Sequence, residues 1–323
     1  MQRPFRFGLQ AFEAASADEW FGIVRRTEAY GYSTLFTSDH YFGPGSISDA
    51  TAHRPVDMAP LSSIAVAAAV TETLRVGCRV FACDLHHPVV LAKEMATLDV
   101  LSRGRVEVGL GAGWLAAEYE GLGVPMDTPG IRIQRLAEYV EVLRAHWSGE
   151  PIDLGGEYVC VSGFAGRPVP TQQPGPPILI GGGAPKILRL AGRLADIASL
   201  NFNNSSGRLG SASVVSSGAD ATAEKIEWIR DGAGDRFDDI EIEIGAYFVA
   251  IGDDVAPQLD AMAQRYGVDS DVFASHPHAL FGTVEQVCET LIDRRDRYGI
   301  SYVTVAQRYI DEFAPVVAAL TGR

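Results

Sequence analysis

An Asp–His pair follows the short β-prone run at 33–37, in the segment Ser38-Asp39-His40-Tyr41. Histidine is the side chain that exchanges protons near neutral pH without help, and a carboxylate beside it can orient or charge the ring. This pattern predicts proton transfer by His40 with Asp39 as its partner. The alternative is that the four residues only begin a polar loop.

Two glycine-rich segments each follow a run typical of a strand. Without side chains, their backbones could lie against a flat ring or a phosphate. The second segment leads through Pro185 into a helix, so its free amides, the helix dipole and one lysine could bind phosphate. Tight turns would explain the same glycines. The residues concerned are Gly111, Ala112, Gly113, Gly181, Gly182, Gly183 and Lys186.

Three aromatic residues stand beside these segments. Tyr41, Trp114 and Phe202 could wall an apolar pocket for a planar ligand, or could belong to the core. A metal site is not predicted, because Cys78, Cys83, His86 and His87 lack the spacing of metal ligands. The histidines on either side of Pro277 are expected on a surface loop.

Short β-prone runs alternate with helical patterns along the chain, which is typical of βαβ units and a parallel sheet. Eight such strands with helices outside predict an α/β fold of the (β/α)₈ TIM-barrel type. Strands are expected at 5–9, 33–37, 74–81, 105–110, 177–181, 195–200, 241–250 and 301–306. Helices are expected at 17–30, 57–71, 87–101, 129–147, 184–193, 219–231, 283–298 and 311–321.

The length of 323 residues suits one such barrel, so residues 1–323 are expected to form a single domain. Three connections exceed the usual length and are candidate functional insertions, at about 38–56, 148–176 and 201–219. A hairpin is expected within the second, at 152–161. In a barrel these insertions belong to the face at the carboxyl ends of the strands, where active sites are built.

The composition excludes several classes of function. A formal net charge of −14 without clusters of Lys and Arg argues against nucleic acid as a partner. No run of about 18 apolar residues predicts a membrane span, and residues 1–10 are too polar for a signal sequence. Four cysteines do not form a disulfide framework. A cytoplasmic protein is therefore expected.

Taken together, the segments resemble the luciferase-like superfamily of barrel oxidoreductases, and more narrowly its coenzyme F420-dependent branch. The resemblance covers nearly the whole chain. It rests on Ser38-Asp39-His40, on residues 74–80, on the block 87–105, on residues 107–114, Glu118-Tyr119, 178–183 and 195–197, and on Phe281-Gly-Thr-Val-Glu-Gln-Val287.

The resemblance implies a cofactor at the carboxyl-terminal mouth of the barrel and a homodimer. It implies that Asp39 and His40 face the deazaflavin or the substrate, and that the glycines at 111, 113 and 181–183 approach ring and phosphate. It also implies a non-prolyl cis peptide at Arg79-Val80 against one face of the ring. In the sugar-phosphate dehydrogenase branch a glutamate follows the strand-four glycines, whereas this chain has Trp114, which favours a bulkier or more apolar substrate.

The leading hypothesis is hydride transfer between C5 of coenzyme F420 and a small organic substrate. His40 would accept or donate a proton, and Asp39 would orient the His40 ring. Glu13 is a weaker acid–base candidate. The cofactor supplies the hard chemistry. An FMN-dependent monooxygenase on the same barrel is the nearest alternative. A cofactor-free lyase or isomerase that binds substrate phosphate, and a non-catalytic flavin-binding protein, also stay open.

Overall fold

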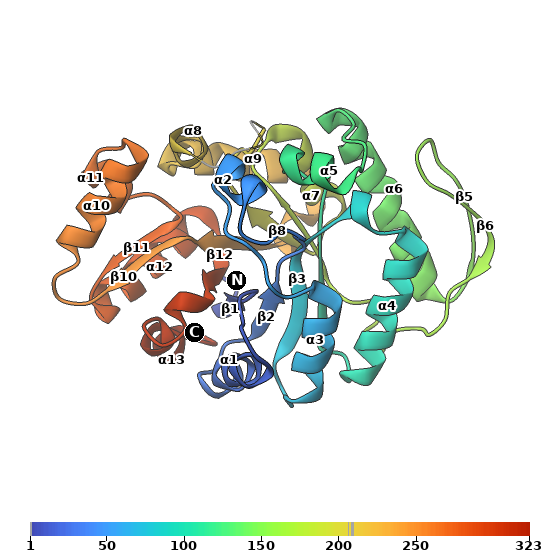
Figure 1. Cartoon of the computed structure of the whole chain (residues 1–323), viewed down its shortest axis with the longest axis horizontal. Helices are drawn as coiled ribbons and strands as arrows, with labels where there is room; N and C mark the ends of the chain where they lie inside the picture. The colour runs from blue at the N-terminus through green and yellow to red at the C-terminus, as the bar shows by residue number, and fades with distance from the viewer. Residues whose placement is uncertain (1, 206, 208–209) are drawn as a thin grey trace.

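A closed barrel of eight parallel strands forms the centre of the molecule in the computed structural model (Figure 1), which describes residues 2–205, 207 and 210–323. The predicted TIM-barrel class is confirmed. Around the barrel the strands follow one another in the order β1, β12, β9, β8, β7, β4, β3, β2. Their bounds are β1 Arg6–Gln10, β2 Thr34–Thr37, β3 Arg75–Ala82, β4 Val106–Gly111, β7 Ile178–Gly182, β8 Ile197–Leu200, β9 Glu241–Ala246 and β12 Ile300–Ala306.

Eight helices lie at the positions predicted from apolar periodicity. They cover the barrel through stripes such as Trp20, Ile23 and Val24, all buried against it. Thr283 is the N-cap of the helix Val284–Tyr298 and forms a capping box with Gln286. The eight are α1 Ala17–Ala29, α3 Pro60–Ala69, α4 Pro88–Leu101, α6 Pro129–Ser148, α7 Pro185–Leu194, α9 Ala219–Ala233, α12 Val284–Tyr298 and α13 Ala314–Leu320.

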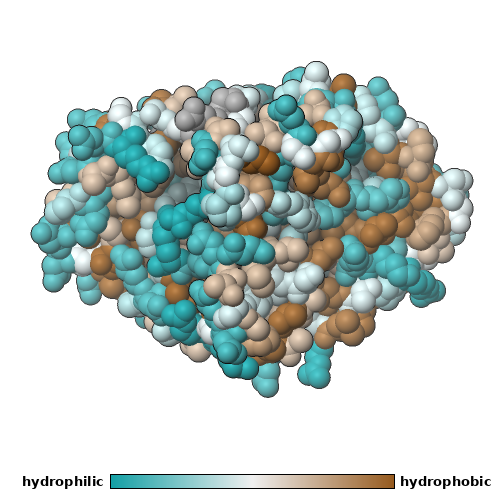
Figure 2. Space-filling view, in the orientation of Figure 1, coloured by the Kyte–Doolittle hydropathy of each residue, from teal (hydrophilic) through white to brown (hydrophobic). Residues whose placement is uncertain are grey.

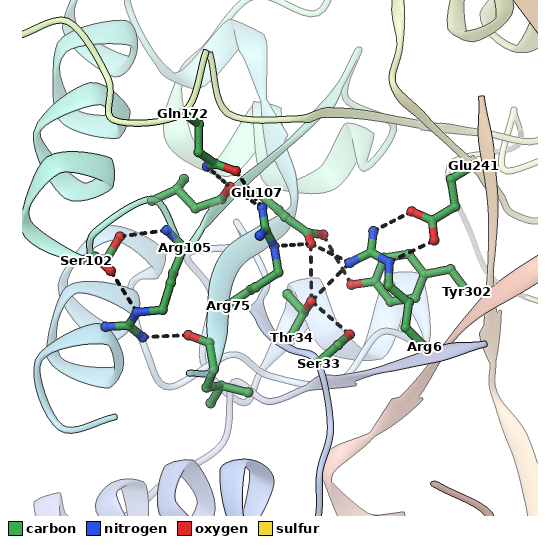
Figure 3. Close-up of polar contacts among 12 residues, drawn as sticks. Arg6, Ser33, Thr34, Arg75, Ser102, Arg105, Glu107, Gln172, Glu241 and Tyr302 are labelled. Carbon is green, nitrogen blue, oxygen red and sulfur yellow. Dashed lines mark hydrogen bonds and ion pairs between the residues drawn. The ribbon is translucent and has the colours of Figure 1, made fainter. Parts of the chain in front are cut away.

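An ionic network closes the amino-terminal floor of the barrel (Figure 3). Arg6 lies between Glu107 and Glu241, with a 2.5 Å contact to each, and its guanidinium stacks 3.6 Å from the centre of the Tyr302 ring. Arg75 adds a second cation 2.7 Å from Glu107. Above this floor Phe36, Leu179, Ile197 and Tyr302 form an apolar cluster. The lumen is therefore filled with side chains below the mouth.

The predicted strand at 241–250 is wrong in one respect, because the chain leaves the barrel after Ala246. The backbone N–H groups of Tyr247 and Phe248 both donate to the carbonyl of His278, and β10 (Phe248–Ile251) then pairs in parallel with β11 (Ala279–Gly282). The run 241–250 carries charge only at Glu241 and Glu243 and shows no break between residues 244 and 250, so composition alone gave no sign of this exit.

Shorter elements that were not predicted cover the mouth and one side of the barrel. In Figure 1 helices α2, α5 and α8 lie along the top of the barrel, whereas α10 and α11 accompany β10 and β11 at the left. Four of them have only five to seven residues, too few for a clear helical period, whereas α10 has 11 residues and was missed all the same. They are α2 Ser46–Thr51, α5 Ala116–Leu122, α8 Ser211–Val215, α10 Ala256–Tyr266 and α11 Ser270–Ala274.

The three predicted insertions differ in content. The first holds α2, and the second holds an antiparallel hairpin of β5 (Pro151–Gly155) and β6 (Cys160–Ala165), which projects at the right of Figure 1. The third insertion holds α8. Residues 206, 208 and 209 of this insertion lie outside the described residues. Whether the whole chain acts as one domain stays a prediction.

Apolar side chains gather on one side of the surface, in the region of α4, α6 and the hairpin (Figure 2). Exposed apolar residues of these elements include Val90, Leu101 and Phe164, with Leu101 75% exposed. The homodimer implied by the resemblance stays a prediction. Among the described helices, none is long and apolar enough to cross a membrane.

Candidate active site at the barrel mouth

His40 and Glu118 form a pair at the barrel mouth. His40 Nδ1 lies 2.6 Å from Glu118 Oε2, and the other carboxylate oxygen accepts a 2.7 Å hydrogen bond from the backbone N–H of Tyr41. His40 follows β2, and Glu118 lies on α5, which follows the strand-four glycines. Only 14% of the His40 side chain and 3% of the Glu118 side chain are exposed. Both groups therefore meet in a largely dry environment, which strengthens their interaction.

Asp39 does not orient His40, contrary to the prediction. Its carboxylate is buried and accepts hydrogen bonds from the backbone N–H of Ala82 and from the hydroxyl of Tyr41, each at 2.8 Å. Nε2 of His86 lies 2.9 Å from the same carboxylate. Asp39 thus joins the ends of β2 and β3, because its backbone turns its side chain towards β3 while that of His40 turns towards α5.

Aromatic rings surround His40. The ring of His53, from the insertion after β2, lies 4.5 Å from it, and Trp114 stands edge-on at 6.1 Å and 88°. Burial, together with the nearby His40, lowers the pKa of His53 to about 4. His53 is therefore neutral at physiological pH and adds no charge beside His40. The predicted pocket residue Trp114 does lie beside the candidate proton-transfer residue.

Arg79 and Val80 occupy the lumen just below the mouth. The peptide bond between them is cis, as the resemblance implied. The Arg79 guanidinium crosses the lumen to Glu243 on β9, at 3.0 Å, and to Ser199 on β8, at 3.2 Å. Burial acts to lower the pKa of Arg79, but the charge of Glu243 opposes it and the net pKa is raised. Arg79 remains charged and forms a polar layer across the barrel.

The glycines of β4 make room for neighbouring side chains. A Cβ at Gly111 would lie 2.6 Å from Cγ2 of Val80, closer than real atoms approach. Gly113 has a φ of +70°, and a Cβ there would collide with the hydroxyl of Tyr119. These glycines are thus required for the placement of Val80 and α5. Their contact with a cofactor stays a prediction.

The glycines of β7 also have packing reasons. A Cβ at Gly182 would lie 2.3 Å from Ile187 of α7, and one at Gly183 would lie 2.1 Å from the carbonyl oxygen of Phe202. Gly181 has only ordinary contacts, with Val80 and Ser199. These three amides stay candidates for binding phosphate.

Four other predicted residues lie apart from the His40–Glu118 pair. Glu13 forms an exposed 3.3 Å ion pair with Arg54, and Lys186 is exposed on the first turn of α7. Phe202 is buried in the aromatic cluster around β10, and the carbonyl of Ala112 accepts a 2.9 Å hydrogen bond from Arg132. Their roles in binding stay predictions.

A cavity of about 370 Å³ opens beside Glu118, between residues 41–47 and α5. Its wall includes Tyr41, Phe42, Ile47 and Leu122 as well as Glu118. The buried carboxylate therefore has His40 on one side and a cavity large enough for small molecules on the other.

The sequence profile of luciferase-like monooxygenases matches residues 4–267. The chain belongs to this family. An uncharacterised protein of Mycobacterium tuberculosis is 34% identical over 203 residues, which cover 59% of this chain and 70% of that protein. An F420-dependent glucose-6-phosphate dehydrogenase of Gordonia bronchialis is 26% identical over 315 residues, which cover 96% and 85%.

A solved structure of this fold is the coenzyme F420-dependent tetrahydromethanopterin reductase of Methanopyrus kandleri. It superposes with a TM-score of 0.76 at 18% identity, over 98% of this chain and all of that one. At this identity the likeness concerns the fold alone.

The mouth suits a planar cofactor, judged from its own residues. The apolar Val80 side chain stands beside the polar layer of Arg79. Thr304 Oγ1, on β12, and Asn204 Oδ1, after β8, are buried without a hydrogen-bond partner in the described part of the chain. Buried polar atoms without partners are uncommon and mark sites where a ligand can bind. Together with the apolar Val80, these two atoms are compatible with a flat ring that has polar edges.

Sequence reasoning missed Glu118, His53 and the burial of the histidines near Pro277. Glu118 had one signal, since Glu118-Tyr119 is part of the resemblance, but nothing local joins residue 118 to residue 40. His276 and His278, expected on a surface loop, are 2% and 1% exposed. Among the described residues, no group of three or more His, Cys, Asp or Glu could hold a metal ion.

Proposed function

We propose that the chain is an F420-dependent oxidoreductase that moves a hydride between the deazaflavin and a small organic substrate. The observation that carries this proposal is the His40–Glu118 pair, 2.6 Å apart at the mouth of a barrel lined by Val80. The F420-dependent dehydrogenase of Gordonia bronchialis, which aligns with 96% of the chain, supports the choice of cofactor.

The roles of the residues follow from their positions. When bound, the deazaflavin supplies the carbon that accepts or donates the hydride. Val80 would offer its apolar side chain to the bound ring. His40 takes the proton from the substrate hydroxyl when a carbon–oxygen bond is oxidised, and returns it in the reverse direction. Asp39 is occupied by Ala82 and Tyr41 and keeps the ends of β2 and β3 together.

The surroundings of His40 favour an uncharged substrate with an apolar part. Trp114 stands beside the imidazole at the position where the sugar-phosphate branch has a glutamate, and an indole cannot exchange a proton. His53 and Phe42, with ring centres 4.5 and 5.7 Å from His40, add further uncharged surface. A small alcohol or carbonyl compound, rather than a sugar phosphate, fits these walls.

Titration of the purified apoprotein with F420 and with FMN tests the proposal. We expect saturable binding of F420, followed by the shift of its chromophore, and then anaerobic reduction of F420 by a panel of alcohols. Binding of neither cofactor would overturn the proposal and favour a cofactor-free lyase or isomerase. Tight F420 binding without turnover of any substrate would favour a non-catalytic binding protein.

An FMN-dependent monooxygenase is the second candidate, because the family profile describes monooxygenases. The two candidates differ in their need for oxygen. A deazaflavin has carbon where flavin has N5 and does not support the oxygen adduct, so F420 turnover proceeds anaerobically. Preference for FMN together with oxygen-dependent turnover would replace the first proposal by the second.

A further inference from the structure

We infer that Glu118 is a positioning residue that holds His40 in a single tautomer, with the proton on Nδ1 and Nε2 free to accept one. The inference deepens the proposed function and rests on it for its kinetic consequences. The structural part concerns only the chain's own hydrogen bonds.

The two oxygens of Glu118 have different partners. Oε1 receives the backbone N–H of Tyr41 at 2.7 Å, and this group can only donate. Oε2 lies 2.6 Å from His40 Nδ1. An ionised carboxylate can only accept, so the proton of this bond belongs to Nδ1. Nε2 makes no hydrogen bond within the described part of the chain and is left as the proton acceptor of the ring.

The position of Glu118 is itself fixed. The next residue on α5, Tyr119, is buried and donates a 3.0 Å hydrogen bond from its hydroxyl to Asp84. Asp84 is held in turn by Arg135 on α6, at 2.5 Å. Tyr119 can occupy this place because Gly113 has no Cβ. α5 is therefore anchored directly beside the residue that meets His40.

Of the groups described around His40, only Glu118 is placed to fix the tautomer of its ring. His53 is neutral because burial lowers its pKa to about 4, and Trp114 and Phe42 carry no charge. Asp39 and Tyr41 are bonded to each other at 2.8 Å. Glu118 also stabilises the imidazolium that forms when Nε2 receives a proton.

The proton balance of the step is simple. In the oxidation of an alcohol, the carbinol carbon gives its hydride to the oxidised deazaflavin and the hydroxyl gives its proton to His40 Nε2. The carbon–oxygen bond becomes a carbonyl. The imidazolium then loses the proton from Nε2 to water after product release, so the Nδ1 proton stays on His40, hydrogen-bonded to Glu118, throughout.

Glu118→Gln separates positioning from simple space filling. The amide has nearly the same shape but only one oxygen, and the N–H of Tyr41 requires it. The NH₂ group would then face His40 Nδ1 and donate to it, which moves the ring proton to Nε2. The ring would keep its place but present a donor where an acceptor is required. Glu120→Gln, an exposed position on the same helix, is the matched control.

The first measurement is the ¹⁵N NMR spectrum of the histidine-labelled full-length protein, with the His40 signals identified from a His40→Gln variant. We expect Nδ1–H with an unprotonated Nε2 in the wild type and in Glu120→Gln, and the reverse in Glu118→Gln. An Nε2–H tautomer in the wild type would overturn the inference. Because this readout uses no cofactor, it is independent of whether the proposed function holds.

The second measurement is steady-state turnover. We expect Glu118→Gln to lower kcat roughly 10²- to 10⁴-fold, by analogy with tautomer loss at other histidine–carboxylate pairs, with cofactor Kd changed less than about 3-fold. Glu118→Ala opens a space that joins the cavity of about 370 Å³, so formate is expected to restore part of kcat in a saturable manner. Equal kcat in Glu118→Gln and Glu120→Gln would contradict the inference, as would the absence of any rescue by formate.

Discussion

Arg79 and Glu243 meet across the lumen of the barrel, from two strands that lie opposite each other. Arg79 Nε lies 3.0 Å from Glu243 Oε1, and both side chains are at most 4% exposed. β3 and β9 are four strands apart in the closed order, so the ion pair spans the full width of the barrel. The next residue, Val80, packs against the apolar cluster of Phe36, Leu179, Ile197 and Tyr302, so the ion pair lies directly beside that cluster.

Breaking this pair should destabilise the protein. Glu243→Gln leaves the Arg79 guanidinium buried without a countercharge, and removal of one partner of a buried ion pair costs about 3 to 5 kcal/mol. Urea unfolding at neutral pH measures this loss. Glu227→Gln, which removes an exposed ion pair with Arg230, is the control and should cost less than about 0.5 kcal/mol. Equal losses in the two variants would contradict the buried pair as a source of stability.

The floor of the barrel predicts a loss of stability in acid. Burial acts to raise the pKa of Glu107, but Arg6 and Arg75 outweigh it and the pKa is lowered from 4.5. A carboxyl whose pKa is lowered by folding stabilises the fold above its unfolded value, and this contribution is lost as the pH falls through the folded value.

The free energy of unfolding of the wild type should therefore fall as the pH drops below about 4.5, the unfolded value. Unfolding curves collected from pH 7 to pH 3 test this. Glu107→Gln should be less stable at pH 7 and show a shallower decline below pH 4.5. A variant whose decline runs parallel to that of the wild type would assign the acid sensitivity to other groups.

The sequence predicts the barrel because its signal is periodic and repeated. Each of the eight strands is followed by a helix whose apolar stripe is visible in the sequence. On α1, for example, the stripe is formed by Trp20, Ile23 and Val24. Most of the elements that were missed are too short for periodicity, as α5 is, or continue the run of a strand, as β10 continues β9. A local sequence pattern cannot predict that the chain leaves the barrel after β9, because this exit depends on the pairing of β10 with β11.

The sequence predicted which segments lie near the site, but it did not predict which side chains contact one another there. His40 and Trp114 were found because they follow strands, and the structure brings them together. Glu118 was missed because its contact with His40 joins residues 78 positions apart in the chain. The glycines were noticed, but their neighbours Val80 and Tyr119 are visible only in three dimensions.

The buried His276 predicts a second, separate acid effect. Its Nε2 lies 2.9 Å from the carbonyl of Val214, and its Nδ1 accepts the backbone N–H of His278 at 3.2 Å, so the neutral ring is fully bonded. Burial, aided by the charges of Arg294 and Lys225, lowers its pKa from 6.5 to about 4. Between these values the unfolded chain binds a proton that the folded chain excludes, so folding weakens as the pH falls.

This effect is on the order of 3 kcal/mol at most, since each pKa unit corresponds to about 1.4 kcal/mol. His276→Asn should flatten the decline of unfolding free energy between pH 6.5 and pH 4, whatever its effect on absolute stability. His87→Asn, at an exposed position, should leave the decline unchanged. An unaltered slope in His276→Asn would sink the prediction.

Gly111 should control the position of Val80. Gly111→Ala places a Cβ 2.6 Å from Cγ2 of Val80, and that side chain must move towards the mouth or the strand must shift. Overpacking of this kind costs about 1 to 3 kcal/mol. We expect a Kd for the cofactor at least 10-fold higher, measured by chromophore titration at a temperature where the variant stays folded. Gly155→Ala, on the hairpin away from the mouth, meets no atom within 4 Å; it is the control and should bind normally.

His40 should be required for turnover and not for binding. Its ring is bonded only to Glu118 within the described residues, so His40→Ala removes the proton acceptor while leaving Val80 and the barrel wall in place. We expect cofactor Kd within about 3-fold of the wild type and kcat at least about 10²-fold lower, because positioned general acid–base groups contribute 10² to 10⁴. His87→Ala removes an exposed histidine and should leave both quantities unchanged. If His40→Ala retained wild-type turnover, proton transfer would have to be assigned to another group, and His86, 2.9 Å from Asp39, would be the next to test.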